Sequence, residues 1–453
     1  MNGWSQLAVG LSIFTLLFSV LVYDAHVVWQ DEAQIVGWGR EILGYDVNQA
    51  SLSPETNEQY VLFAPVSQVV LAWADENLGK LRHRVLTILF AFASGIALYL
   101  LLVSLGLSSG ISAIAGAGLF MDPMYLLSWS GGRADSLAFF FCILGAASLS
   151  IGFSRASLMR WFLWGVALVS FVLGCLCWIT AAVLVFQLVA LVLALRVEWS
   201  VQLLTQYKFV LLGAASLVAG GIVLLLSQGN LVGTMMILLN NSGTVMDLIA
   251  AFNWNYPLLF LSVFLLALGA RKIVLFPVGV LVISLGVFTL TDVYVFRAIY
   301  AVPLMYALIA IVSQTYTGRW SEARHYGLLG LVLLNFLVAG YAMPGMRLRD
   351  IAFNRPDRLI DELNQFSWGE GSRVYCEPWE IVMLGYGDFI PVRHFNSFEL
   401  KSAIEIVDSY DWLVIGLESK YSREFKGGTV ICKNCGSYGP YLVVESKNVS
   451  AQN

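Results

Sequence analysis

Charged residues are scarce in this chain of 453 residues, where they make up 12% of the sequence. A soluble domain carries roughly a quarter of its residues as Asp, Glu, Lys and Arg. Hydrophobic residues reach 58%, and the mean hydropathy is +0.75. One soluble core cannot hide that much apolar surface, whereas a lipid bilayer can. The shortage of charge therefore excludes an ordinary soluble protein and indicates an α-helical polytopic membrane protein.

Basic residues are not in excess either, because 26 Lys and Arg stand against 30 Asp and Glu. The formal net charge of −4 does not suit a phosphate backbone, so no nucleic-acid partner is expected. The first apolar segment lacks a positively charged start, and no small-residue cleavage site stands out. We therefore expect a retained membrane span there rather than a signal peptide.

Cysteine is also sparse, and only one CxxC motif occurs, from Cys432 to Cys435. A structural zinc site takes about four ligands, and no histidine lies near this motif. With Cys376, these residues are the cysteines of the C-terminal segment, and a disulfide among them is favoured over a metal in an oxidising compartment. The remaining three are expected to pack as small hydrophobic side chains. They are Cys142, Cys175 and Cys177.

Apolar runs that are long enough to cross a bilayer recur from residue 5 to residue 343. A transmembrane helix needs about 20 mostly apolar residues, and on this measure we predict about eleven spans. The predicted spans cover residues 5–23, 84–106, 109–129, 134–153, 160–176, 178–196, 208–227, 255–269, 273–290, 298–313 and 326–343. The run 160–196 is too long for one helix, and we predict a break at Trp178 to Thr180.

Basic residues between the predicted spans set the orientation, because cytoplasmic loops are enriched in Lys and Arg. With the N-terminus inside, the basic residues of the inner loops are Arg155, Arg160, Arg196, Lys208, Arg271, Lys272, Arg319 and Arg324. Loop 24–83 and the segment 344–453 then lie outside the cytoplasm. The sequence thus predicts a multi-pass protein of the plasma (inner) membrane with an extracytoplasmic C-terminal domain.

Two domains are expected: a transmembrane domain, 1–343, and a small soluble α/β domain, 344–453. Within the first outer loop we predict a helix at 32–43 and an amphipathic segment from Tyr60 to Trp73 that lies along the membrane surface. In the C-terminal domain, charges become common and short β-rich runs alternate with helical patterns. The predicted strands are 373–376, 412–415, 428–432 and 441–445, and the predicted helices are 355–365 and 399–409.

Three carboxylates follow the first span closely: Asp24, Asp31 and Glu32. Two interpretations of Asp31 stay open. Asp31 followed by Gln34 resembles a capping box, so Asp31 can cap the predicted helix and be favoured by the helix dipole. That interpretation leaves Asp24 and Glu32 unexplained, and the alternative is that Asp31 serves chemistry at the outer face.

Further charged residues lie at the outer ends of later predicted spans. GGRADSLAFFF contains Arg133 and Asp135, and TDVYVFRAIYAVP contains Asp292, Tyr294 and Arg297. Such residues usually pair or line a polar cavity. The arginines can instead extend to lipid headgroups, but this does not explain Asp135 and Asp292. Acids and bases that share an outward-facing cavity suit a reaction in which a carboxylate accepts a proton and cations hold a phosphate leaving group.

These segments resemble the GT-C glycosyltransferases, which include the protein O-mannosyltransferases and the lipid A aminoarabinose transferases. WQDEAQIVGWGREIL resembles their aspartate-containing first-loop motif. LFAPVSQVVLAWADENLGKLRHRVLTILFAFASGIALYLL resembles their surface segment and arginine step into the second span, although consecutive prolines are missing. SGGRADSLAFFF resembles their arginine-to-aspartate step, and FRAIYAVPLMYALIA their arginine-aromatic-proline entry into a late span. The resemblance covers about residues 5 to 343.

The resemblance implies an enzyme that moves a sugar from a polyprenyl-phosphate-type donor to a lipid, glycan or protein acceptor outside the cytoplasm, usually with inversion. It implies that Asp31 is the general base and that Glu32 orients Asp31 or binds the sugar. Asp135 would bind a sugar hydroxyl or help to hold a metal, and Arg297 would hold the donor phosphate. The further substrate-binding candidates are Arg82, Arg84, Arg133, Asp292 and Tyr294. A divalent metal stays open, because carboxylate oxygens suit one and only some relatives use one.

Two other classes of protein remain as alternatives. A transporter or lipid flippase would show charged or broken helices near the bilayer midplane and internal symmetry, and the sequence shows neither. A noncatalytic assembly subunit would bind its partner through the C-terminal domain, and Asp31 would be dispensable. Sugar transfer by membranes with Asp31→Asn separates these classes.

Overall fold

The structure, a computed structural model, divides the chain into two compact units. The first unit is Met1–Leu21, Thr87–Ser130 and Ala134–Pro344, and the second is Val22–Leu86, Gly131–Arg133 and Gly345–Asn453. The described residues are 3–23, 30–45, 64–178, 180–196, 249, 252, 255–269, 277–285, 298–315, 321–337, 356–368, 372–376, 390–392, 411–417, 428–433, 435 and 439–446.

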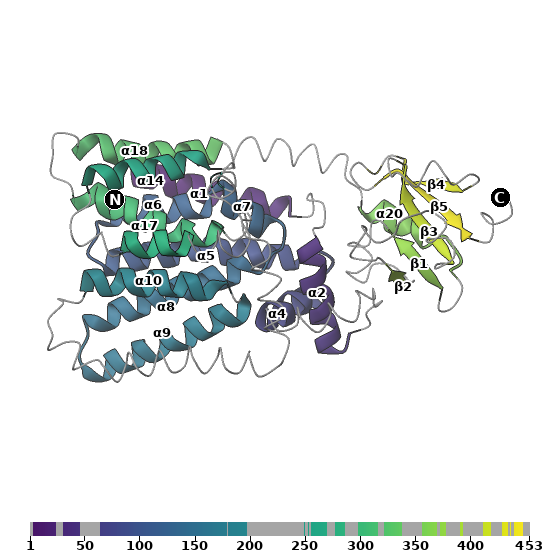
Figure 1. The fold of residues 1–453 in the computed structure, drawn as a ribbon, viewed down its shortest axis with the longest axis horizontal. Coiled ribbons are helices and arrows are strands. Elements are labelled where there is room, and N and C mark those ends of the chain that lie inside the picture. Colours follow the sequence, from purple (N-terminus) through teal and green to yellow (C-terminus); the bar gives the residue numbers. More distant parts are fainter. Residues whose placement is uncertain are drawn as a thin grey trace. The chain divides into compact units, whose positions relative to one another are not determined.

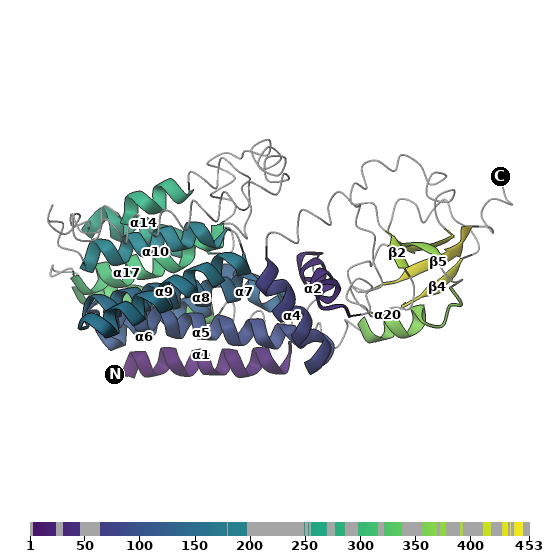
Figure 2. The ribbon, with the colours of Figure 1, turned by 90° about the horizontal axis from the view of Figure 1, so that it is seen from below.

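Long apolar helices make up most of the first unit, and Figures 1 and 2 show them running side by side in one bundle. Among the described residues, four helices are long and apolar enough to cross a membrane. They are α1 (Gly3–Leu21), α5 (His83–Ser104), α8 (Asp135–Phe153) and α9 (Ser157–Cys177). Large apolar side chains on α9 face away from the protein, such as Leu158 at 84% exposed, as expected of a surface against lipid. The protein is therefore a multi-pass membrane protein.

Shorter apolar helices among the described residues also belong to the bundle. They are α10 (Ala181–Arg196), α14 (Tyr256–Gly269), the 3-10 turn η1 (Ile299–Ala301), α17 (Val302–Thr315) and α18 (Ser321–Asn335). The predicted break within 160–196 is confirmed, because α9 ends at Cys177 and α10 begins at Ala181. The predicted span 208–227 lies outside the described residues, and the total number of spans stays a prediction.

The predicted span 109–129 is not one continuous helix. It consists of α6 (Ser109–Phe120) and α7 (Pro123–Ser130), whose axes are bent by 53°. Pro123 is the first residue of α7, where its missing N–H is tolerated, whereas inside a continuous helix it would remove a hydrogen bond and clash. The length of the apolar run alone does not indicate this bend.

Close backbone contact holds α5 against α6. A Cβ atom on Gly116 would lie 2.4 Å from the carbonyl oxygen of Gly95, and a Cβ on Gly95 would lie 2.7 Å from that of Gly116. Small residues let membrane helices approach at this distance, where van der Waals packing drives their association.

Two helices form the described part of the first predicted outer loop, and they pack against each other. They are α2 (Gln30–Leu43) and α4 (Pro65–Leu78). Because α2 begins at Gln30, Asp31 lies inside its first turn and not at the capping position before it. The amphipathic segment predicted from Tyr60 is helical from Pro65, again with proline as the first helical residue. Residues 60–63 lie outside the described part.

The C-terminal segment contains a five-stranded mixed sheet with the order β2-β1-β3-β5-β4. The strands are β1 (Arg373–Cys376), β2 (Ile390–Val392), β3 (Trp412–Gly416), β4 (Thr429–Ile431) and β5 (Tyr441–Glu445). β1 is parallel to β2 and β3, and β5 is antiparallel to β3 and β4. The predicted strands are confirmed, and β2 is an addition. Helix α20 (Pro356–Leu363) confirms one predicted helix, whereas 399–409 lies outside the described residues.

Candidate functional site

Glu32 of α2 and Arg84 of α5 form a buried ion pair. Arg84 Nε lies 2.5 Å from Glu32 Oε1, and Arg84 Nη2 lies 2.7 Å from Glu32 Oε2, so the guanidinium grips both carboxylate oxygens. Both side chains are fully buried. Burial alone would raise the pKa of Glu32, but the charge and hydrogen bonds of Arg84, together with those of His83, lower this pKa to about 2. The Glu32 carboxylate is therefore ionised throughout the physiological pH range.

His83 connects Glu32 to Asp75 of α4. Its Nε2 atom lies 2.7 Å from Glu32 Oε1, and its Nδ1 atom lies 2.9 Å from Asp75 Oδ1. An ionised carboxylate only accepts hydrogen bonds, so both ring nitrogens must donate, and only the protonated imidazole does this. His83 therefore carries a positive charge between two negative ones.

Arg40 of α2 extends this chain of contacts across α4. Its Nη1 atom lies 3.1 Å from Asp75 Oδ2, and its Nη2 atom lies 2.5 Å from Glu76 Oε2. We call Glu32, Arg40, Asp75, Glu76, His83 and Arg84 the acid–base network. Its three acids balance three bases, as buried charges must be paired to offset their lost hydration. The network fixes α2, α4 and the start of α5 to one another.

Asp75 also stabilises the turn between α4 and α5. Leu81 in this turn has a φ of +59°, a conformation that costs a residue with a side chain roughly 1–2 kcal/mol. The backbone N–H of Leu81 donates to Asp75 Oδ1 at 2.8 Å, which helps to hold this conformation. The turn leaves the next residue, Arg82, exposed, whereas Arg84 is buried. Arg82 and Arg84, both predicted from the sequence to bind substrate, thus have different surroundings.

The glycine-rich turn before Asp135 packs directly on the acid–base network. A Cβ atom on Gly132 would lie 2.5 Å from Glu32 Oε1 and 3.0 Å from His83 Nε2. The φ of Gly132 is +68°, which residues with a side chain rarely adopt. Only glycine fits this position without displacing Glu32. The neighbouring Arg133 is buried, with 3% of its surface exposed.

Asp135 lies in the first turn of α8 and is buried. Its Oδ2 atom accepts a hydrogen bond from Ser128 Oγ at 2.6 Å, and its Oδ1 atom accepts one from Tyr300 Oη at 2.8 Å. Tyr300 lies in η1, three residues after Arg297. Asp135 therefore ties α8 to the segment that follows Arg297. A contact of Asp135 with a sugar or a metal stays a prediction.

Several residues proposed from sequence lie partly or wholly outside the described atoms. Asp31 is placed by its backbone in the first turn of α2, next to Glu32, and its side chain lies outside the description. Asp292, Tyr294 and Arg297 lie outside the described residues. Their roles stay predictions.

Sequence reasoning missed Arg40 and Asp75. Asp75 had one weak signal in the sequence, because it is an acid that directly follows the apolar residues LAWA. Its partners lie in other elements, and nothing in the sequence indicates them. Tyr300 lies in the sequence motif that contains Arg297, and nothing in that motif indicates its hydrogen bond to Asp135.

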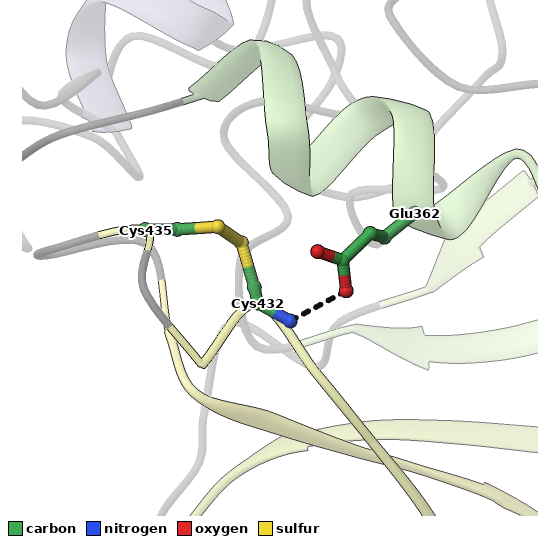
Figure 3. A group of neighbouring side chains, drawn as sticks. All are labelled: Glu362, Cys432 and Cys435. Carbon is green, nitrogen blue, oxygen red and sulfur yellow. Dashed lines mark hydrogen bonds between the residues drawn. A yellow bond between two sulfur atoms is a disulfide. The ribbon is translucent and has the colours of Figure 1, made fainter.

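In the C-terminal segment, Cys432 and Cys435 form a disulfide, and Glu362 of α20 accepts the backbone N–H of Cys432 at 2.7 Å (Figure 3). Among the described residues, these three bring acid and cysteine ligand atoms within 4.8 Å of one another, the spacing of a metal site. With the two sulfur atoms bonded to each other, the thiolates that zinc requires are absent. The disulfide confirms the preference drawn from the sequence, and Glu362 docks α20 beside it.

The described fold thus combines a bundle of apolar helices, a first-loop helix anchored by buried charges and a small C-terminal sheet. Two solved structures share this fold. The crystal structure of ArnT from Cupriavidus metallidurans bound to undecaprenyl phosphate matches with a TM-score of 0.66 and 14% identity, covering 98% of each chain. The apo state of that protein matches with a TM-score of 0.58 and 13% identity, again over 98% of each chain.

No protein-family model matches the sequence, and no curated protein matches it. The likeness to ArnT therefore establishes the fold, and the fold class predicted from sequence is confirmed.

Proposed function

We propose that this protein is a GT-C-type glycosyltransferase that moves a sugar from a polyprenyl-phosphate-linked donor to an acceptor outside the cytoplasm. The observation that carries the proposal is the match, over 98% of both chains, to ArnT bound to undecaprenyl phosphate. Such a donor combines a long apolar chain with a charged phosphate. An apolar bundle suits the chain, and the arginines near the predicted outer face suit the phosphate.

In the proposed reaction, a hydroxyl oxygen of the acceptor attacks the anomeric carbon of the donor sugar. The bond from this carbon to the phosphate oxygen breaks, and the polyprenyl phosphate leaves with the electron pair. Asp31 accepts the proton of the attacking hydroxyl as general base. Direct displacement inverts the anomeric centre. Arg297, with exposed Arg82 as the second candidate, stabilises the negative charge on the leaving phosphate.

The position of Asp31 suits a general base. A base must be ionised before it accepts a proton, and the first turn of a helix favours a negative charge through the backbone dipole. Asp31 lies in the first turn of α2, and its neighbour Glu32 is held by Arg84 and His83. A catalytic group must be held within a fraction of an ångström of its working position, and such anchoring supplies that precision.

Two roles were open for Glu32, and we assign it the orienting one. Its carboxylate is fully buried, and both of its oxygens are bound by Arg84. A sugar hydroxyl would have to displace a charge-assisted hydrogen bond to reach it. We likewise assign Arg84 to positioning rather than to donor binding. Asp135 takes the corresponding role in the first unit, where it anchors the segment that follows Arg297.

We further propose that the C-terminal domain lies outside the cytoplasm. Disulfides persist in oxidising compartments and are rare in the cytosol. The Cys432–Cys435 disulfide supports this location, which agrees with the orientation drawn from the basic loops. Protease digestion of sealed, outward-facing vesicles tests it. Protection of this domain from added protease would reverse the proposed orientation.

Sugar transfer in proteoliposomes tests the proposed function. Undecaprenyl-phosphate-linked hexose and pentose donors, radiolabelled in the sugar, are supplied with a membrane extract that contains acceptors. Wild-type protein is expected to move label from donor to product, and Asp31→Asn is expected to abolish this transfer. Asp361→Asn is the matched control, because Asp361 is an exposed acid of α20. Equal transfer by the wild type and Asp31→Asn would exclude Asp31 as the base.

A further inference from the structure

Asp122 is a fully buried carboxylate of the first unit that the proposed reaction does not use. It lies at the bend between α6 and α7. Its Oδ1 atom accepts the backbone N–H groups of Met124 at 3.0 Å and Tyr125 at 3.1 Å, which caps α7. Its Oδ2 atom accepts hydrogen bonds from the side chains of Asn255 and Tyr306. One carboxylate thus joins the bend to α14 and α17.

The surrounding hydrogen bonds require a carboxylate at this position. Asn335 of α18 donates to the Tyr306 hydroxyl oxygen at 2.5 Å, so the hydroxyl hydrogen is left to bind Asp122. The side-chain oxygen of Asn255 accepts the N–H of Leu258 at 3.2 Å, so its amide nitrogen is left to donate. Four donors therefore converge on Asp122. A carboxylate accepts hydrogen bonds at both oxygens. The side-chain NH2 group of an asparagine at this position would instead face other N–H or O–H donors.

A second tyrosine of the same chain segment makes the same kind of contact. Tyr300 donates to Asp135 at 2.8 Å, and Tyr306 donates to Asp122 at 3.1 Å. Asp122 directly precedes α7, and Asp135 lies five residues after its end, so the two carboxylates flank this helix. The two tyrosines are six residues apart, which is about 9 Å at the rise of a helix. The segment formed by η1 and α17 is thus held at two positions along its axis.

We propose that these two tyrosine–aspartate bonds form a clamp that fixes the axial position of α17 and thereby positions Arg297 for donor binding. Arg297 lies three residues before Tyr300, so a shift of α17 along its axis moves it as well. Sliding would remove one hydrogen-bond donor from each of the two buried carboxylates, Asp122 and Asp135, which is unfavourable. Tyr306 and Asp122 are then positioning residues, because they act through Arg297. This inference rests on the proposed function, since it uses the role proposed there for Arg297.

Steady-state kinetics of Tyr306→Phe test the clamp. Loss of this bond to a charged group is expected to raise the KM for an undecaprenyl-phosphate-linked sugar by roughly tenfold and to leave the KM for the acceptor unchanged. A change that only reduced the amount of folded protein would lower the apparent kcat and leave both KM values unchanged. Tyr326→Phe is the matched control, because Tyr326 is 56% exposed on α18. Unchanged donor KM in Tyr306→Phe would overturn the clamp.

Hydrogen exchange provides a readout that does not need activity. Peptides covering residues 298–301 are expected to exchange faster in Tyr306→Phe than in the wild type, and at the wild-type rate in Tyr326→Phe. Asp122→Asn is expected to speed this exchange at least as much as Tyr306→Phe, because it also disturbs the hydrogen bonds from Asn255 and from the start of α7. Equal exchange in all variants would overturn the clamp. Faster exchange in a protein that transfers no sugar would support the clamp and overturn the proposed function.

Discussion

Replacing Glu32 by Gln removes the charge at the centre of the acid–base network and leaves Arg84 and His83 buried without their shared anion. The pKa of Glu32 falls from 4.5 to about 2 in the folded protein. One pKa unit corresponds to about 1.4 kcal/mol, so the fold favours the ionised form by about 3 kcal/mol. Breaking a buried ion pair typically costs about 3–5 kcal/mol. The expected loss in the free energy of unfolding is therefore about 3 kcal/mol or more.

Denaturant titration of the purified protein in detergent measures this loss. Glu76→Gln is the control, because the side chain of Glu76 is 39% exposed and contacts only the outer end of the network, through Arg40. An ion pair with one exposed partner is worth at most about 1 kcal/mol. Similar losses in Glu32→Gln and Glu76→Gln would refute the reasoning. Sugar transfer by Glu32→Gln is expected to show a lower kcat and an unchanged donor KM, because the role that we propose for Glu32 is to orient Asp31 and not to bind the donor.

The lowered pKa of Glu32 also determines how the stability of the protein changes with pH. Because the pKa of Glu32 is lowered on folding, its contribution is fully present above pH 4.5 and is lost as the pH falls toward about 2. Stability that depends on Glu32 is therefore constant at neutral pH. The difference in stability between the wild type and Glu32→Gln is expected to shrink between about pH 4.5 and pH 2. A difference that grows on acidification would contradict the assignment.

Two further predictions concern the glycine-rich turn and the disulfide. Gly132→Ala is expected to lower both sugar transfer and stability, because its Cβ would displace Glu32. Gly106→Ala is the control, because Gly106 has a φ of +93° and no atom lies within 4 Å of the added Cβ. Its expected loss of stability is therefore only the backbone cost of roughly 1–2 kcal/mol. Equal effects of the two substitutions on stability and transfer would contradict the close approach of Gly132. Cys435→Ser opens a short loop and is expected to destabilise the C-terminal sheet by about 2 kcal/mol, measured by denaturant titration. An unchanged unfolding midpoint would exclude a stabilising disulfide.

The helices of the bundle were predictable because each depends on its own residues. A run of apolar side chains is forced into a helix by the bilayer, where every backbone polar group must be satisfied within the segment. The break after Cys177 followed from length alone. The bend at Asp122 did not, because Asp-Pro within an apolar run looks like a single interruption until its capping bonds are seen.

The candidate site was predictable as a set of charged residues but not as a set of contacts. Glu32 and Arg84 are 52 residues apart, and Asp135 and Tyr300 are 165 apart. The sequence around each residue does not indicate which residue it contacts, because the burial and pairing of charges depend on how separate helices pack together. Sequence therefore indicated that Glu32 and Asp135 matter, and the structure shows them as anchors of their neighbours.

Single-turnover sugar transfer with Asp31→Asn tests the central claim most directly. Enzyme in excess over a radiolabelled undecaprenyl-phosphate-linked sugar isolates the chemical step from product release, and native mass spectrometry with undecaprenyl phosphate measures donor-site binding in parallel. Loss of the proposed general base is expected to lower the rate constant by roughly 10²–10⁴-fold while binding stays at the wild-type level. A rate constant in Asp31→Asn equal to that of the wild type would contradict the account.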